Sequence, residues 1–177
     1  MPRGSFNTCL RLSLVLACCA ALSSIAKTPS VEITEYRIGQ RLPDAALQGI
    51  NGPSRHLRDF RGKPLLINVW ASWCGPCKQE MTSLERLAWS EFAQHINIIG
   101  ISTDDYPQHA KQWLARSHST ISHFIDEQLR LEHMLGASRL PLTVLVGADG
   151  RILSKIYGAR DWDSPQALAL LRAQFAL

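Results

Sequence analysis

The sequence predicts an α/β protein of three layers, with helices on both faces of a mostly parallel sheet that has an antiparallel edge. Two observations predict this architecture. Nearly continuous apolar runs at 65–72 and 96–103 are typical of strands buried on both faces, and helical apolar spacing follows each run. The segment 142–158 then places two strands around Asp149-Gly150, a strong signal for an antiparallel hairpin.

The first half of the domain supplies three elements in order. Residues 45–57 hold Asn51-Gly52 between two short semi-apolar stretches, which predicts a hairpin. The strand at 65–72 comes next, and a helix begins at Gly75-Pro76, because proline suits a first helical turn. The apolar positions of that helix recur at helical spacing: Met81, Leu84, Leu87, Ala88 and Phe92.

The second half continues the alternation. After the strand at 96–103 we expect a helix over 107–118, a short strand over 121–125, a helix over 126–137, the hairpin over 142–158 and a last helix over 164–175. Gly136 closes the third helix in this prediction. Ser164 and Pro165 open the last helix as N-cap and first helical residue.

The first 26 residues have the organisation of a secretory signal peptide. Arg3 and Arg11 form a basic start, an apolar stretch follows, and small residues precede a cleavage site after Ala26. The apolar stretch is shorter than the roughly 20 residues that span a bilayer. We therefore expect export to the periplasm, a leader or linker over 27–37 and one folded domain over 38–177.

Two other fates of the N-terminus stay open. The segment could remain uncleaved as a membrane anchor, because cleavage is inferred only from its length and small residues. The sequence also places Ala17 before Cys18, as in proteins that carry a lipid on such a cysteine.

Cleavage would change the length, net charge and cysteine count from which the function is inferred. The mature chain would have 177 − 26 = 151 residues, and the loss of two arginines would lower the net charge from +4 to +2. No run of basic residues occurs, so a nucleic-acid partner is not supported. Of five cysteines only Cys74 and Cys77 would remain, in a compartment where disulfides persist.

The Cys74-x-x-Cys77 pair fits redox chemistry better than its two alternatives. A structural zinc site needs a second pair of ligands, and the chain has no other cysteine pair and only scattered histidines, so we expect no metal. A structural disulfide across so small a loop would constrain the unfolded chain little. Cys74 falls where a strand ends and a helix begins, which lowers the pKa of a thiol. We therefore expect Cys74 to attack a disulfide and Cys77 to resolve the mixed disulfide.

The stretch "VWASWCGPCK" resembles the active-site segment of thioredoxins, and residues 38–177 resemble the secreted TlpA/ResA-like branch of that superfamily. The resemblance implies a thioredoxin-like fold with an N-terminal hairpin extension and a central helix-and-strand insertion. The 37 residues between Thr103 and Pro141 leave room for that insertion. "RLPLTVLVGADGR" is the second matching segment, and it implies a cis bond before Pro141.

The same resemblance implies a substrate groove and an acidic assistant. Pro141 would face the cysteines, Leu140 would offer backbone groups to an extended substrate, and Gly158 would lie beside Pro141. Residues Trp73, Gly75 and Pro76 would complete the groove, with Trp73 shielding the disulfide and Trp70 in the core. Arg160, Asp161 and Trp162 would follow in a loop that either shapes partner choice or is simply solvated.

Asn68 occupies the position of the buried acid of cytosolic thioredoxins, and it cannot titrate. Glu80, three residues after Cys77 on the same helix, is the expected replacement that tunes the cysteines and moves protons. The alternative is that Glu80 only favours the first turns of its helix.

These observations predict a periplasmic thiol:disulfide oxidoreductase that needs no bound cofactor and works as a monomer. The Gly75-Pro76 dipeptide resembles that of reducing thioredoxins, so protein disulfides would be reduced. By resemblance, a membrane thiol transporter would donate the electrons, and the clients would serve cytochrome c maturation or respiratory copper-site assembly. A Sco-like copper-binding assembly protein is the alternative, although its cysteine spacing is wider. A peroxiredoxin loop and a non-catalytic module fit the cysteine pair less well.

Overall fold

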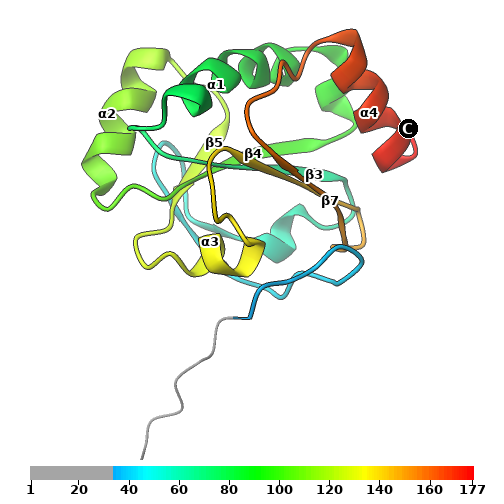
Figure 1. The fold of residues 1–177 in the computed structure, drawn as a ribbon, viewed down its shortest axis with the longest axis horizontal. Helices are drawn as coiled ribbons and strands as arrows, with labels where there is room; N and C mark the ends of the chain where they lie inside the picture. The colour runs from blue at the N-terminus through cyan, green and yellow to red at the C-terminus, as the bar shows by residue number, and fades with distance from the viewer. Residues whose placement is uncertain (1–33) are drawn as a thin grey trace, which may run out of the picture. The chain divides into compact units, whose positions relative to one another are not determined.

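The computed structural model describes residues 34–177, which form a mixed α/β domain (Figure 1). The predicted signal peptide (1–26) and most of the predicted leader (27–37) lie outside the described residues, so both stay predictions. Contacts of the described N-terminal stretch with the rest of the domain begin at Glu35, which pairs with Lys155, and Tyr36 donates a backbone hydrogen bond to Met134. Among the described residues, no helix combines the length and apolar character that crossing a membrane requires.

One sheet of seven strands, in the order β2-β1-β5-β4-β3-β6-β7, forms the middle of the domain. Its strands are β1 (Ala46–Gly49), β2 (Arg55–His56), β3 (Leu65–Trp70), β4 (Asn97–Ser102), β5 (Ser122–Ile125), β6 (Leu142–Val146) and β7 (Ile152–Tyr157). The three central strands β3, β4 and β5 are parallel, whereas the pairs on both flanks are antiparallel. The prediction of a mostly parallel sheet with one antiparallel edge is therefore wrong: only two of the six strand pairings in residues 34–177 are parallel, because both the N-terminal hairpin β1–β2 and the β6–β7 hairpin join the parallel centre by antiparallel pairing.

Helices cover both faces of this sheet, as expected for three layers (Figure 1). The helices are α1 (Gly75–Ala88), α2 (Pro107–Ser117), α3 (Arg130–Leu135) and α4 (Pro165–Phe175), with short 3-10 helices η1 (Leu57–Phe60) and η2 (Glu91–Gln94). Helices α1, α2 and α4 lie on one face, and α3 with η1 lies on the other. The predicted insertion between β4 and β6 is α2, β5 and α3.

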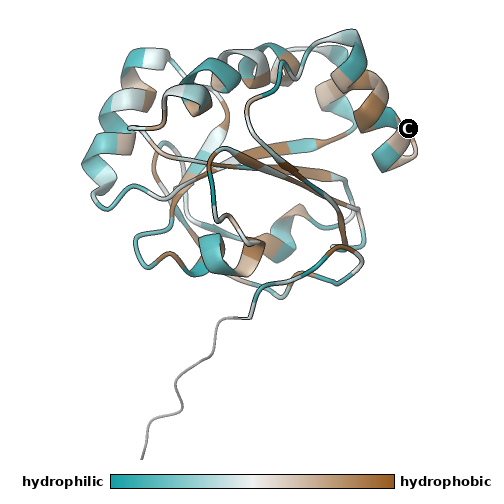
Figure 2. Ribbon diagram, in the orientation of Figure 1, coloured by the Kyte–Doolittle hydropathy of each residue, from teal (hydrophilic) through white to brown (hydrophobic). Residues whose placement is uncertain are grey.

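Strand β3 shows how the sequence divides the core between the two faces. Every residue of β3 is buried, and alternate side chains point to opposite sides. Leu66 and Trp70 join the apolar cluster under α1, α2 and α4, while Ile67 joins the cluster under α3. The apolar colouring of the central strands follows from this double burial (Figure 2). Asn68 shares the face of Leu66 and therefore points toward α1.

Two helix boundaries differ from the prediction. Helix α3 begins at Arg130 and not at residue 126. Asp126 turns its side chain onto the free N–H groups of Arg130 and Glu132, at 3.0 and 2.7 Å, and this local capping replaces four residues of helix. Helix α1 ends at Ala88, so Phe92 is a buried residue of η2.

Candidate active site

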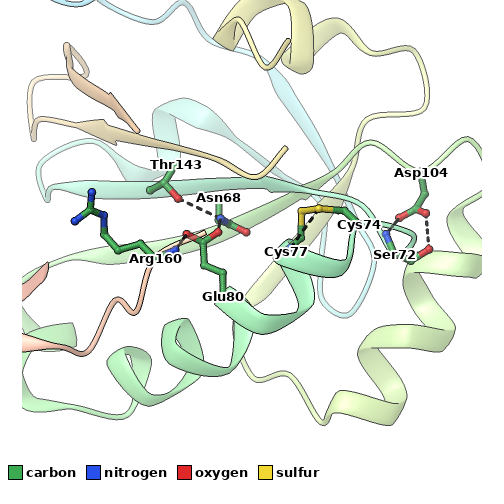
Figure 3. Close-up of a disulfide and its surroundings, with 8 residues drawn as sticks. All are labelled: Asn68, Ser72, Cys74, Cys77, Glu80, Asp104, Thr143 and Arg160. Atoms are coloured by element: carbon green, nitrogen blue, oxygen red, sulfur yellow. Dashed lines mark hydrogen bonds between the residues drawn. A yellow bond between two sulfur atoms is a disulfide. The ribbon is translucent and has the colours of Figure 1, made fainter. Parts of the chain in front are cut away.

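Cys74 and Cys77 form a disulfide at the start of α1 (Figure 3). The two sulfur atoms are 2.02 Å apart. Cys74 is the N-cap of the helix, and the backbone N–H of Cys77 donates a hydrogen bond of 3.2 Å to the Cys74 sulfur. Free N–H groups at a helix N-terminus stabilise negative charge, so this position favours a thiolate at Cys74 in the reduced protein.

The exposure of the two cysteines matches unequal roles. Cys74 keeps 5% of its surface exposed, whereas Cys77 is fully buried. Gly75 and Pro76 between them are exposed. These exposures agree with the predicted roles, in which a partner disulfide would reach the Cys74 sulfur first and Cys77 would attack afterwards from within the helix.

The segment around Pro141 adopts the arrangement expected for the groove. The Leu140–Pro141 bond is cis, and Pro141 is buried at the start of β6. The N–H of Gly158 donates a 2.9 Å hydrogen bond to the Pro141 carbonyl oxygen. Gly158 has a φ of 86°, a left-handed conformation that favours glycine at this point of the chain. Whether Leu140, Pro141 and Gly158 bind a substrate stays a prediction.

The two tryptophans before the cysteines lie in opposite environments. Trp70 is fully buried, as predicted, and its ring packs 5.1 Å from that of Trp113. Trp73 leaves 70% of its surface exposed next to Cys74. Most of this side chain is thus open to solvent, and whether Trp73 shields the disulfide or contacts a partner stays a prediction.

Glu80 is a buried carboxyl group held between α1 and β3 (Figure 3). Its oxygens accept hydrogen bonds from Asn68 Nδ2 at 2.9 Å, from Trp162 Nε1 at 2.5 Å and from the backbone N–H of Arg160 at 3.2 Å. Asn68 also donates to Thr143 at 3.1 Å, which links the network to β6. Glu80 is thus hydrogen-bonded to Asn68, the residue that occupies the position of the buried acid of cytosolic thioredoxins.

Burial raises the pKa of the Glu80 carboxyl above its ordinary value, although the hydrogen bonds from Trp162, Asn68 and Arg160 act in the opposite direction. A carboxyl group of this kind can hold or release a proton near the cysteine pair.

Trp162 departs from the alternative of a simply solvated 160–162 loop, although Arg160 and Asp161 are exposed. It is fully buried in the core under α1, and its backbone N–H donates to Ser83 Oγ at 2.9 Å. Arg86, one turn further along α1, pairs with Asp163 at 2.5 Å and with Asp161 at 3.0 Å. Glu80, Ser83 and Arg86 therefore fix the 158–163 segment to one face of α1.

A second polar cluster, which the sequence patterns did not predict, lies on the other side of Cys74 (Figure 3). Asp104, directly after β4, accepts hydrogen bonds from the N–H of Ser72 at 2.9 Å, from Ser72 Oγ at 2.6 Å and from Ser102 Oγ at 2.7 Å. These bonds tie the loop before Cys74 to β4 (Figure 3). The position of Asp104 after a predicted strand could have indicated this cluster, because the carboxyl ends of neighbouring parallel strands meet at one edge of the sheet.

The structure has a cysteine pair at the start of the helix that follows β3, and a cis-proline before β6, the strand that pairs with β3. On a sheet of this topology, these features are those of the thiol:disulfide oxidoreductases of the thioredoxin superfamily. The chain belongs to the Redoxin family, whose family model matches residues 37–171. Its relatives place it with the TlpA/ResA-like members, in agreement with the sequence prediction.

Among curated proteins, the thiol-disulfide oxidoreductase ResA of Geobacillus thermodenitrificans (strain NG80-2) is 28% identical over 150 residues, which cover 84% of this chain and 86% of the relative. A candidate thiol:disulfide interchange protein DsbE from Chlorobium tepidum has the same fold, with a TM-score of 0.69 at 24% identity, covering 79% of this chain and 99% of that chain. A candidate thiol-disulfide oxidoreductase from Bacteroides vulgatus gives a TM-score of 0.68 at 26% identity, covering 78% and 97%.

The site can carry out dithiol–disulfide exchange with its own residues. The Cys74 thiolate attacks one sulfur of a partner disulfide, a mixed disulfide forms, and the other partner sulfur leaves as a thiolate. Cys77 then attacks Cys74, re-forms the internal disulfide and releases the partner as a dithiol. Two electrons pass to the partner, and the protein ends in the oxidised form that the structure shows.

A Glu80→Gln variant is expected to change how stability depends on pH. The raised pKa means that folded Glu80 keeps a proton which the unfolded chain has already released above its ordinary pKa of 4.5. Stability of the natural chain therefore falls as pH rises through this window, and glutamine removes that loss. The free energy of unfolding of the variant, measured with urea from about pH 4 to about pH 8, should improve relative to the natural chain as pH rises.

Glu91→Gln provides the control, because Glu91 is exposed in η2 and its loss should leave the pH profile parallel to that of the natural chain. The same Glu80→Gln protein tests the proton-transfer role through titration of the Cys74 thiolate. If the unfolding profiles of the natural and variant chains were parallel and the thiolate titration were unchanged, the role of Glu80 in its helix would be purely structural.

Proposed function

We propose that this protein reduces disulfides of other proteins in the periplasm, in cytochrome c maturation or in respiratory copper-site assembly. The observation that carries the proposal is the Cys74–Cys77 pair at the N-terminus of α1 with Gly75-Pro76 between the sulfurs. That dipeptide resembles the one of reducing thioredoxins. The name of the ResA relatives, thiol-disulfide oxidoreductase, supports the reaction class.

The proposed location rests on the N-terminal 26 residues, which read as a cleaved signal peptide. After cleavage Cys74 and Cys77 would be the sole cysteines, as a recycling redox centre in an oxidising compartment requires. We further propose a monomer that receives its electrons from a membrane thiol transporter. Cell fractionation and N-terminal sequencing should find a periplasmic protein that starts at Lys27. A membrane-bound or lipid-modified form would support an anchor or a lipid on Cys18 instead.

The reduction potential of the cysteine pair decides the direction of electron flow. We expect a value near that of reducing thioredoxins, about −270 mV, and not near the about −120 mV of a strong oxidant. Equilibration with defined ratios of reduced and oxidised glutathione or dithiothreitol measures this potential. A value near that of the strong oxidants, together with failure to reduce insulin disulfides, would contradict the reductase proposal.

Clients can be identified with a Cys77→Ser variant expressed in its natural host. This variant should stop at the mixed disulfide, because no second thiol is present to release the partner. Mass spectrometry of the trapped complexes should find apocytochromes c or copper-assembly proteins. A variant with both cysteines replaced should trap nothing. Trapped proteins that belong to neither class would contradict the proposed pathway while leaving the chemistry intact.

A further inference from the structure

Asp104 is a buried carboxylate at the end of β4, close to the attacking cysteine. Only 1% of its surface is exposed. Its partners are an N–H group and two hydroxyl groups, from Ser72 and Ser102. Three donors around one carboxylate are the arrangement that an ionised, acceptor-only group requires.

The negative charge of Asp104 has no cation to offset it within the described residues, because none of the ion pairs of residues 34–177 includes Asp104. The elements around Asp104 carry further charged or titratable groups. They are Lys78, Glu80, Glu85 and Arg86 on α1, Asp105 in the loop before α2, His109, Lys111 and Arg116 on α2, and His123 and Asp126 on and after β5. Asp126 is buried like Asp104, and its backbone N–H donates to the Ser102 carbonyl oxygen at 2.9 Å. Lys78, Asp105 and His109 are exposed, and Glu80 is held by Asn68, Arg160 and Trp162. Solvent screens the exposed groups more than the buried Asp104.

Asp104 also binds a residue that lies close to Cys74 in the sequence. The carboxylate contacts Ser72 N and Ser72 Oγ, and Ser72 precedes Cys74 by two residues. Two peptide units span at most about 7.6 Å, so the Cα of the residue that Asp104 binds lies within that distance of the Cys74 Cα. In a partly buried site, two charges separated by roughly 10 Å still interact several times more strongly than they do in water.

We propose that Asp104 sets the redox equilibrium of the cysteine pair: its charge disfavours the Cys74 thiolate and thereby favours the disulfide, while its bonds to Ser72 position the loop that carries Trp73 and Cys74. Asp104 is thus a positioning residue for the redox centre. The charge of Asp104 acts against the N–H groups at the N-terminus of α1, which stabilise the same Cys74 thiolate. Because the thiolate is then less stable, the reduced protein is a stronger electron donor.

The measured reaction is the two-electron reduction of the Cys74–Cys77 disulfide. Dithiothreitol gives two electrons to the Cys74–Cys77 disulfide and becomes a cyclic disulfide. The S–S bond of the protein breaks, Cys77 takes one proton, Cys74 remains a thiolate, and the second proton passes to solvent. A nearby negative charge raises the free energy of the reduced side alone, because the disulfide is neutral.

The test compares Asp104→Asn with Ser72→Ala and Ser102→Ala in the purified full chain. Asp104→Asn removes the charge, so the equilibrium with dithiothreitol should shift about tenfold toward the reduced protein, which corresponds to about 30 mV, and the Cys74 thiolate should form at lower pH. The two serine variants keep the charge and remove one donor each. They should shift the equilibrium in the opposite direction, toward the disulfide.

Asp149→Asn is the control, because Asp149 lies in the turn between β6 and β7 and its carboxylate pairs with Arg151. It should leave the equilibrium with dithiothreitol unchanged within about twofold, as expected for a site without contact to the Cys74 loop. The proposal is overturned if Asp104→Asn leaves the equilibrium unchanged, or if it and the serine variants shift it in the same direction. Should Asp104→Asn fail to fold, the serine variants decide: any result other than a shift toward the disulfide overturns the proposal.

The consequence for electron flow rests on the proposed reductase function, but the measurement does not. Dithiothreitol reports on the cysteine pair without any client protein. If the chain reduced no protein disulfide, the effect of Asp104 on the equilibrium would still be measurable. Conversely, an unchanged equilibrium in Asp104→Asn would leave the trapping of clients by Cys77→Ser unaffected.

Discussion

A Cys74→Ser variant is expected to lose the catalysed reduction of protein disulfides, with a fall in rate of at least about a thousandfold. The hydroxyl of serine does not form an anion at neutral pH, so the helix N-terminus has no nucleophile to present. Cys77 cannot substitute for it, because Cys77 is fully buried in the oxidised protein. The measurement is the rate of insulin disulfide reduction with dithiothreitol as electron donor.

The Cys77→Ser protein provides the matched control for this assignment of roles. It should also lose turnover, yet still form a mixed disulfide with a substrate in a single step, whereas Cys74→Ser should form none. Mass spectrometry after incubation with a peptide disulfide separates the two outcomes. A mixed disulfide formed by Cys74→Ser and not by Cys77→Ser would reverse the roles.

A Trp162→Ala variant is expected to destabilise the protein by about 3–5 kcal/mol, the range for loss of a large aromatic side chain from a core. The Trp162 ring is fully buried, and its Nε1–H group binds Glu80. Loss of the ring therefore opens a cavity under α1 and leaves the buried carboxyl without one of its donors. Urea unfolding of the natural and variant chains measures the effect.

Two further variants separate packing from hydrogen bonding. Trp162→Phe keeps most of the ring but not its N–H group, so a smaller loss of about 1–3 kcal/mol is expected from the unsatisfied Glu80 carboxyl. Trp89→Ala removes a tryptophan that is 76% exposed, and stability should change by less than about 0.5 kcal/mol. Equal losses for Trp162→Ala and Trp89→Ala would contradict the assignment of Trp162 to the core.

The sequence was sufficient for elements whose signals are local. Apolar runs and turn pairs predicted β3, β4 and the β6–β7 hairpin, since a strand buried on both faces has no polar alternation to obscure it. Ser164 and Pro165 predicted the start of α4, and the structure shows Ser164 Oγ accepting a hydrogen bond from the N–H of Ala167. Helix α3 was predicted too long because capping by Asp126 competes with helical hydrogen bonds, and periodicity does not reveal that competition.

The sequence by itself thus determined the fold class, through its apolar runs and turn pairs. It also determined the class of chemistry of Cys74 and Cys77, through their spacing of three positions at a strand-to-helix junction. Only the tertiary structure decided what surrounds them. Asn68 and Trp162 meet Glu80 from 12 positions before it and 82 positions after it, and Asp104 reaches Ser72 across 32 positions. Contacts of this kind depend on strand order and register, which arise from the packing of the whole sheet and not from any local pattern.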